Sequence, residues 1–398
     1  MTTLRSVLNS YSTMSPTIPN KLPQRGVTIF SVMTALANEV EAVNVSQGFP
    51  DYPADPLLLE MLYGASKSGH NQYAPMPGLL ALRQAVADKY QRVHGCVVDP
   101  EHEITITPGA TAALFTAIAS VVSAGDEVII MDPSYDSYAP SIIANGGIVR
   151  TSNLRTNTYT PDWDHVRSLI TRKTRLIIIN SPHNPCSSVL ELDDLDTLAE
   201  ICNKHDLLVL SDEVYELITF DEHKHISAST HPGLCNRTFV VTSFGKTFHI
   251  TGWKIGVCVA PSDLTRVFRQ VHQYLSFCVN TPAQVALAEY MKDTSRYLGL
   301  QSFFTQKRDL LRSLLMGSAW SLRACSGSYF QLLGYEGISD EQDVDFAKRI
   351  TREFGVATIP LSPFYNGEQR GHERLVRVCF AKEDSTIRLA AERLVCVR

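Results

Sequence analysis

The chain has 398 residues, which at about 150 residues per domain predicts two or three domains around a large buried core. Hydrophobic residues make up 44% and charged residues 19% of the chain, a balance that excludes wholesale disorder. The 36 basic and 41 acidic residues leave a net charge of −5, and the basic residues are scattered. We therefore expect no nucleic-acid partner.

The first twenty residues are predicted to form an N-terminal arm. They contain neither the apolar block of a secretory signal nor the arginine content of a mitochondrial presequence. The nine cysteines include no Cys-x-x-Cys pair, which favours reduced thiols in a cytoplasmic protein. The charge-free stretch 104–125 is broken by Pro108 and Gly109, so we expect a strand, a turn and a helix there and no membrane span.

Short apolar runs of strand length recur along the first two thirds of the chain. They are continuous rather than alternating, which is typical of strands covered on both faces, and the earlier ones are separated by helix-length segments. The runs are 103–107, 127–132, 175–180, 207–212, 238–244 and 254–260. This pattern predicts an α/β fold with a doubly wound, mostly parallel sheet.

The last third of the chain has a different pattern. A long helical stretch at about 282–316 precedes strands near 327–333, 356–360 and 374–380, with helices near 342–354 and 383–396. We expect a smaller α+β domain here, completed by part of the N-terminal segment. The predicted organisation is an arm (1–20), the N-terminal part of the small domain (21–50), a large cofactor-binding domain (51–285) and the C-terminal small domain (286–398).

Reactive side chains lie at the ends of three predicted strands, where α/β sheets bind their ligands. Asn184 follows the 175–180 run, Asp212 ends the next and is followed by Tyr215, and Ser243 and Lys246 follow the third. Taken singly, Asp212 has the ordinary explanation of a helix cap, Tyr215 of a packed aromatic residue and Lys246 of a solvated side chain.

Together these residues meet the chemical demands of pyridoxal 5′-phosphate (PLP). A lysine can form a Schiff base with an aldehyde, and a carboxylate can keep a pyridine nitrogen protonated, so that the ring acts as an electron sink. A phenol and an amide can bind the ring oxygen. Backbone N–H groups of a helix opening at Gly109, with Thr111, Ser243 and Lys254, can bind the phosphate.

Several ordered motifs carry a resemblance to a known family. The strings SDEVYE (211–216) and SFGKTFHITGWKIG (243–256) are similar to the signature of class I and II aminotransferases, the fold type I PLP enzymes. The likeness extends from about Leu22 to the C-terminus through NVSQGFPDY, NQYAPMPG, ITPGATAAL, DPSYDSYAP, HNP and VRVCFAKE. Within the family, HQYLSFCVNTPAQ (272–284) and IPLSPF (359–364) resemble the bacterial methionine aminotransferase branch, which is near to kynurenine and glutamine aminotransferases.

The resemblance implies a role for each motif residue. Lys246 would bond to PLP and move a proton between the substrate Cα and the cofactor C4′, and Asp212 would pair with the pyridine nitrogen. Tyr215 and Asn184 would contact the ring hydroxyl, and Tyr135 would stack on the ring.

The phosphate and the substrate would be held by further residues. The resemblance assigns the phosphate to Ala110, Thr111, Ser243 and Lys254, with Tyr73 reaching across from the second subunit of a homodimer. It assigns the substrate α-carboxylate to Arg377, with help from Asn184 and the backbone around Gly48. Aromatic residues would line the side-chain pocket, namely Phe30, Tyr73, Tyr135, Phe277 and Phe364.

The expected activity is ping-pong transamination between methionine or an aromatic amino acid and a 2-oxo acid. Kynurenine aminotransferase or cysteine-conjugate C–S β-lyase activity is an alternative, and a non-catalytic PLP-binding sensor is a second one. No metal site is expected. One departure from the family is HNPCSSV, in which Ser187 and Ser188 stand where many members have a glycine. It predicts an altered loop geometry with activity retained.

Overall fold

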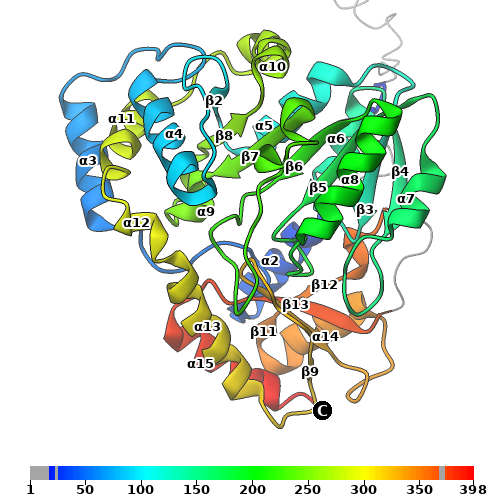
Figure 1. Ribbon diagram of the computed structural model, residues 1–398. Helices are drawn as coiled ribbons and strands as arrows, with labels where there is room; N and C mark the ends of the chain where they lie inside the picture. The colour runs from blue at the N-terminus through cyan, green and yellow to red at the C-terminus, as the bar shows by residue number, and fades with distance from the viewer. Residues whose placement is uncertain (1–17, 23–25, 367–372) are drawn as a thin grey trace, which may run out of the picture.

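The computed structural model describes residues 18–22, 26–366 and 373–398, so most of the predicted arm lies outside the described residues. A seven-stranded sheet in the order β2-β8-β7-β6-β5-β3-β4 forms its centre (Figure 1). β8 is antiparallel to both of its neighbours, and the other pairs are parallel. The strands are β2 (Ile104–Thr107), β3 (Glu127–Asp132), β4 (Ile148–Asn153), β5 (Thr174–Asn180), β6 (Leu208–Asp212), β7 (Thr238–Ser243) and β8 (Gly256–Val259). The predicted α/β class is confirmed.

The central strands are apolar throughout because helices cover both faces of the sheet. In β3, Ile130 packs in one core with residues of α5 (Ala110–Val121), α6 (Tyr138–Ala144) and α10 (Ser262–Leu275). The preceding Ile129 packs in another core with residues of α7 (Trp163–Leu169) and α8 (Leu192–His205). Successive side chains of a strand point to opposite faces, so both must be apolar.

Two expectations about individual elements were wrong. The strand β4 was missed, because it lies at the edge of the sheet and its side chains alternate in exposure, with Ile148 39% exposed. The helical stretch expected at 282–316 is broken into α11 (Thr281–Tyr290), α12 (Ser295–Leu298) and α13 (Leu300–Leu315). The break follows from Asp293, whose carboxylate accepts hydrogen bonds from the Ser295 amide at 3.1 Å and hydroxyl at 2.6 Å.

Smaller sheets join the two ends of the chain. An antiparallel sheet has the order β12-β13-β10-β9, and β1 pairs in parallel with β11, so the N-terminal segment joins the C-terminal part. The domain boundaries themselves stay a prediction. The elements are β1 (Val43–Asn44), β9 (Ser321–Leu322), β10 (Phe330–Gly334), β11 (Val356–Ala357), β12 (Ile359–Pro360), β13 (Leu375–Cys379), α2 (Ile29–Glu39), α14 (Asp343–Phe354) and α15 (Asp384–Val395).

Two further helices, α3 (Pro56–Lys67) and α4 (Leu80–His94), pack with α11 at the β2 edge of the sheet (Figure 1). Asp55 caps α3 by accepting a hydrogen bond from the Leu57 amide at 2.8 Å, and Pro56 occupies the first helical position, where no N–H is needed. Within the described ranges, no helix is both long enough and apolar enough to span a membrane.

Gly78 provides a test of how closely this helical layer approaches the sheet. Its φ is +99°, and a Cβ there would lie 2.3 Å from Cγ1 of Ile106 in β2. Gly69 has a similar φ of +92° but open space around the same position. We expect Gly69→Ala to cost about 1 kcal/mol through backbone strain, and Gly78→Ala to cost about 2 kcal/mol more through the clash.

The measurement is the shift in urea midpoint for each variant against the unsubstituted chain. Because the two glycines share the left-handed backbone, Gly69→Ala isolates the strain, and the difference between the variants reports the packing. Equal shifts would mean that the helices packed on β2 can move away from Ile106 at no measurable cost in free energy.

Candidate active site

A cavity of about 290 Å³ lies at the carboxyl ends of the central strands, between the large sheet and the β10–β13 sheet. Three residues expected from the sequence do not line it: Tyr73 and Phe277 are 83% and 41% exposed, and Phe364 is buried beside it. The predicted residues that line it are Phe30, Gly48, Ala110, Thr111, Tyr135, Asn184, Asp212, Tyr215, Ser243, Lys246, Lys254 and Arg377.

Lys246 lies in the short helix α9 (Phe244–Thr247), which follows directly from β7. Its Nζ donates hydrogen bonds to Oη of Tyr329 at 2.7 Å and to the carbonyl oxygen of Gly48 at 2.9 Å. Desolvation by the surrounding protein lowers the pKa of the Lys246 amine to about 8, and the positive charge of Arg377 acts in the same direction. About a tenth of this amine is therefore neutral, and so nucleophilic, at pH 7, a far larger fraction than for a lysine of ordinary pKa.

Asp212 is the last residue of β6, and its side chain is buried at the cavity. Burial raises the pKa of the Asp212 carboxyl to about 6, although the hydrogen bond that Tyr138 Oη donates to its Oδ2 at 2.7 Å acts against the rise. A buried carboxylate of this kind is stabilised by a cation beside it, which is what a protonated ring nitrogen would supply.

Arg377, in β13, is the buried cation at the opposite side of the cavity. Its Nη1 donates to Oδ1 of Asn184 at 2.5 Å, its Nη2 donates to the Ser46 carbonyl at 3.1 Å, and its Cζ lies 3.9 Å from the centre of the Phe330 ring. Within the described part of the chain, its buried Nε has no hydrogen-bond partner. An unpaired, buried guanidinium N–H is suited to an anionic ligand.

The start of α5, where the sequence predicts phosphate binding, has the geometry of an anion-binding helix N-terminus. Gly109 caps the helix with φ +86°, and a Cβ on it would lie 3.2 Å from Nζ of Lys254. Gly256 in β8 allows the strand to pass so close that its Cβ would lie 2.7 Å from the Ala110 amide nitrogen. The first amides of a helix have no partner within the helix, so Ala110 and Thr111 present N–H groups beside a lysine charge.

These three regions fit PLP. The donor set contains an amine of lowered pKa, a buried carboxylate without an ion-pair partner in the described structure, and a helix N-terminus with a nearby cation. The three face one cavity, so a single molecule with an aldehyde, a ring nitrogen and a phosphate can engage all of them.

The departure from the family at HNPCSSV has a structural counterpart. Ser187 has a left-handed backbone with φ +62°, which a glycine adopts more readily. Its Oγ donates to the Phe330 carbonyl at 2.7 Å, and its carbonyl accepts from the Ser326 and Gly327 amides, each at 2.9 Å. The loop after Asn184 is thus fastened to the segment before β10.

Sequence reasoning missed three residues that contact the site. Tyr138 bonds to Asp212, Tyr329 bonds to Lys246, and Phe330 lies on Arg377. The motif DPSYDSYAP contained Tyr138, but its string offers no sign of a contact 74 positions away. Tyr329 and Phe330 fall in the expected strand 327–333, and the fold alone brings them to the cavity.

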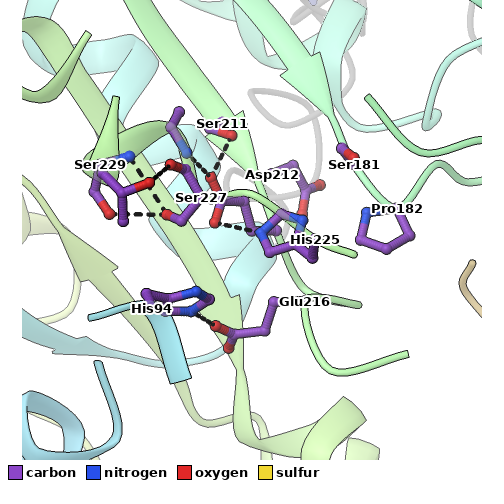
Figure 2. A network of polar contacts seen from close by, with 12 residues as sticks. His94, Ser181, Pro182, Ser211, Asp212, Glu216, His225, Ser227 and Ser229 are labelled. Carbon is purple, nitrogen blue, oxygen red and sulfur yellow. Dashed lines mark hydrogen bonds and ion pairs between the residues drawn. The ribbon is translucent and has the colours of Figure 1, made fainter. Parts of the chain in front are cut away.

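A buried network of polar and charged side chains surrounds the chain segment that begins at Asp212 (Figure 2). Glu216 accepts from Nε2 of His94 at 2.7 Å and forms an ion pair with Lys89, while Glu213 bonds to Nε2 of His225 at 2.8 Å. Glu213 also accepts from the Ser211 hydroxyl at 2.8 Å and the Ala228 amide at 2.9 Å. Glu213 and Glu216 therefore anchor the segment that carries Asp212 and Tyr215.

His225 thus has a structural role. His183 is also structural, since burial lowers its pKa to about 3 and its Nδ1 accepts from the Cys186 amide at 3.3 Å. In the described part of the chain, no three His, Cys, Asp or Glu side chains are grouped as metal ligands.

Comparisons with known proteins agree with this geometry. The sequence matches the family model for aminotransferase class I and II over residues 40–394. Methionine aminotransferase of Escherichia coli strain K12 is 48% identical over 384 residues, which cover 96% of this chain and 99% of that protein. Kynurenine–oxoglutarate transaminase 3 of Rattus norvegicus is 36% identical over 90% of this chain and 86% of the rat protein.

A solved structure gives the same result in three dimensions. The crystal structure of YbdL from Escherichia coli, for which a methionine aminotransferase function was identified, superimposes with a TM-score of 0.92 at 47% identity. The match covers 95% of this chain and 99% of the crystallised chain.

The buried network generates a prediction about stability. Burial alone would raise the pKa of the Glu216 carboxyl, but the charge of Lys89 and the hydrogen bond from His94 lower it to about 2. This carboxylate therefore stabilises the fold above its unfolded pKa of about 4.3, and the contribution is lost as the pH falls toward 2. Lys89→Met should cost about 3 kcal/mol at pH 7, because it leaves the carboxylate without its ammonium partner.

The deficit of Lys89→Met should shrink as the pH is lowered from 7 to 4, since Glu216 can then bind a proton in the folded variant. Urea unfolding at several pH values measures it. Lys292→Met is the matched control, because Lys292 pairs with Glu289 on the exposed surface, and its midpoint should not change. A deficit independent of pH would disprove the electrostatic explanation.

Proposed function

The chain belongs to the class I and II aminotransferases, which are PLP-dependent enzymes, and we propose that its amino donor is methionine or an aromatic amino acid. The observation that carries this proposal is the set of rings around Arg377. Phe330, Phe364 and Phe30 have their ring centres 3.9, 5.1 and 5.5 Å from the guanidinium carbon. Rings beside the carboxylate-binding group favour an apolar or aromatic side chain.

The same pocket disfavours a dicarboxylate donor. Among the described residues that line the cavity, Arg377 is the sole arginine, and the acidic side chain of Asp136 lies there as well. A second substrate carboxylate would need a second buried cation, which in this proposal only the cofactor-binding lysines could provide. The 48% identity to methionine aminotransferase and the 36% identity to a kynurenine transaminase support the same choice of donor.

In the proposed mechanism, Arg377 binds the substrate α-carboxylate through its free Nε and its Nη groups, and Asn184 fixes the plane of the guanidinium. PLP, when bound, supplies an aldehyde for the amino group and a ring that stabilises negative charge at the substrate Cα. Lys246 Nζ takes the Cα proton as a general base, which its lowered pKa allows.

The remaining residues hold the cofactor in this proposal. Asp212 would keep the ring nitrogen charged, and Tyr138 keeps one carboxylate oxygen of Asp212 in place. Tyr215 and Asn184 would contact the ring hydroxyl, and Tyr135, which is hydrogen-bonded to Thr111, would stack on the ring. Ala110, Thr111, Ser243 and Lys254 would hold the phosphate.

We further propose a homodimer in which Tyr73 enters the site of the partner subunit. Tyr73 lies outside the cavity of its own chain, and its ring packs edge-to-face on Phe277, with centres 5.4 Å apart. Other aromatic side chains are also largely exposed, with Tyr63 at 68% and Tyr274 at 91%. Exposed rings of this kind are typical of an interface.

The domain organisation and location of the enzyme are part of the same proposal. The large domain would be 51–285 and would contain the seven-stranded sheet, and the small domain would be 21–50 together with 286–398. We place the enzyme in the cytoplasm, where its nine free cysteines, among them the buried Cys258 and Cys379, would stay reduced.

The half-reaction tests the donor. Purified PLP-loaded enzyme mixed with L-methionine, with no oxo acid added, should release 2-oxo-4-methylthiobutanoate and lose the absorbance of the aldehyde form of the cofactor. Lys246→Ala should slow this release by about 10³-fold or more, because the general base is gone.

Three other outcomes would each assign a different activity to the protein. A response to kynurenine but not to methionine would change the donor. Pyruvate and ammonia formed from a cysteine conjugate, with no acceptor, would indicate C–S β-lyase activity. Bound PLP without turnover of any amino acid would indicate a sensor.

Mixed dimers test the position of Tyr73. Tyr73→Ala and Lys246→Ala subunits, each nearly inactive alone, should regain about a quarter of the full activity when co-expressed in equal amounts. Half of the dimers would then be hybrids, and each hybrid would have one site with both native side chains. If Tyr73 served its own subunit, no hybrid site would be intact and no activity would return.

A further inference from the structure

The hydroxyl of Tyr329 has a position that no role assigned above explains. Tyr329 is buried just before β10, and its Oη accepts a hydrogen bond from Lys246 Nζ at 2.7 Å while donating one to the Gly48 carbonyl at 2.6 Å. Lys246 also donates to that same carbonyl at 2.9 Å. The three polar atoms therefore form a closed triangle.

The two acceptors of this triangle can take both N–H bonds of the neutral Lys246 amine. A neutral lysine amine has two N–H bonds and one lone pair, whereas the ammonium has three N–H bonds and no lone pair. Tyr329 Oη and the Gly48 carbonyl accept one N–H bond each. Because nitrogen is tetrahedral, its lone pair must then point away from both acceptors.

The triangle is rigid because each acceptor is fixed by other contacts. The Tyr329 ring packs against Tyr215, with centres 5.0 Å apart, and against Phe330 at 4.9 Å. Gly48 lies against the ring of Phe330, where an added Cβ would come within 2.9 Å of it. Both acceptors are therefore held in place by contacts with residues other than Lys246.

We propose that Tyr329 is a positioning residue, whose hydroxyl and the Gly48 carbonyl hold the Lys246 amine when it is not bonded to the cofactor and aim its lone pair for proton transfer. This inference rests on the proposed function, in which Lys246 is the general base. The proton passes from the substrate Cα to the Nζ lone pair, which gives an ammonium, and Lys246 would then give this proton to C4′ of the bound cofactor. Lys246 thus gains and loses one proton in each half-reaction.

Tyr329→Phe is the variant that tests the proposal, since it removes one oxygen and keeps the packed ring. We expect the single-turnover rate with L-methionine to fall about tenfold to a hundredfold, because the base is no longer oriented. The dissociation constant of methionine should not change. The isotope effect with 2-deuterated methionine should rise, because proton transfer becomes the slow step.

A second measurement needs no cofactor. The acylation rate of Lys246 in the PLP-free protein, followed by mass spectrometry of its peptide as a function of pH, should have a midpoint near the Lys246 pKa of about 8. In Tyr329→Phe the midpoint should fall, because the ammonium has lost an acceptor that stabilised its charge.

Tyr335→Phe is the matched control. Tyr335 is buried in the small sheet region and its hydroxyl donates to the Glu341 carbonyl at 2.9 Å, so the substitution removes a similar bond away from Lys246. It should change the unfolding midpoint as much as Tyr329→Phe does, but neither the isotope effect nor the acylation midpoint.

The outcomes separate this inference from the proposed function. If the unsubstituted enzyme converts methionine and Tyr329→Phe matches it in isotope effect and acylation midpoint, Tyr329 is merely structural and the inference is wrong. If Lys246→Ala transaminates at the normal rate, the proposed function itself is wrong.

Discussion

The end of β6 is the point on which the site depends, because it carries three buried carboxylates within five residues. Glu213 and Glu216 point away from the cavity and are compensated by His225, His94 and Lys89. Asp212 lines the cavity and has no ion-pair partner among the described residues, only a hydrogen bond from the neutral Tyr138 hydroxyl. The protein therefore neutralises the charges behind the site and leaves the one in front for a ligand.

The site also depends on segments that are far apart in the chain. Lys246 and Asp212 come from the large sheet, whereas Gly48 and Tyr329 belong to the N-terminal segment and to the stretch before β10. Arg377 comes from β13 in the small sheet, and its hydrogen bond to Asn184 joins residues 193 positions apart. No single segment could form the cavity, so the active geometry exists only when the whole fold is assembled.

The sequence predicted the buried strands and most of the site for one physical reason. Strands covered on both faces must be apolar throughout, and their ends must then carry the reactive groups, as Asp212 and Lys246 do. Their roles, together with those of Arg377 and Tyr135, followed from the family resemblance. The strand β4 was not predicted because it lies at the edge of the sheet, where half-exposed side chains interrupt the continuous apolar run that marks the central strands. Tyr138 and Tyr329 escaped prediction because their contacts with Asp212 and Lys246 depend on tertiary structure.

The serine at 187 has a consequence for the unfolded chain as well as for the loop. A glycine at this position would adopt φ +62° without strain, but it would have more freedom to lose on folding, by about 0.4–1 kcal/mol. The strain of a left-handed serine, about 1–2 kcal/mol, is thus offset partly by entropy and partly by the hydroxyl bond to Phe330. Serine and glycine at position 187 should therefore give the fold nearly the same free energy of unfolding. The serine in addition makes the connection between Asn184 and Phe330, whose ring lies on Arg377, stiffer.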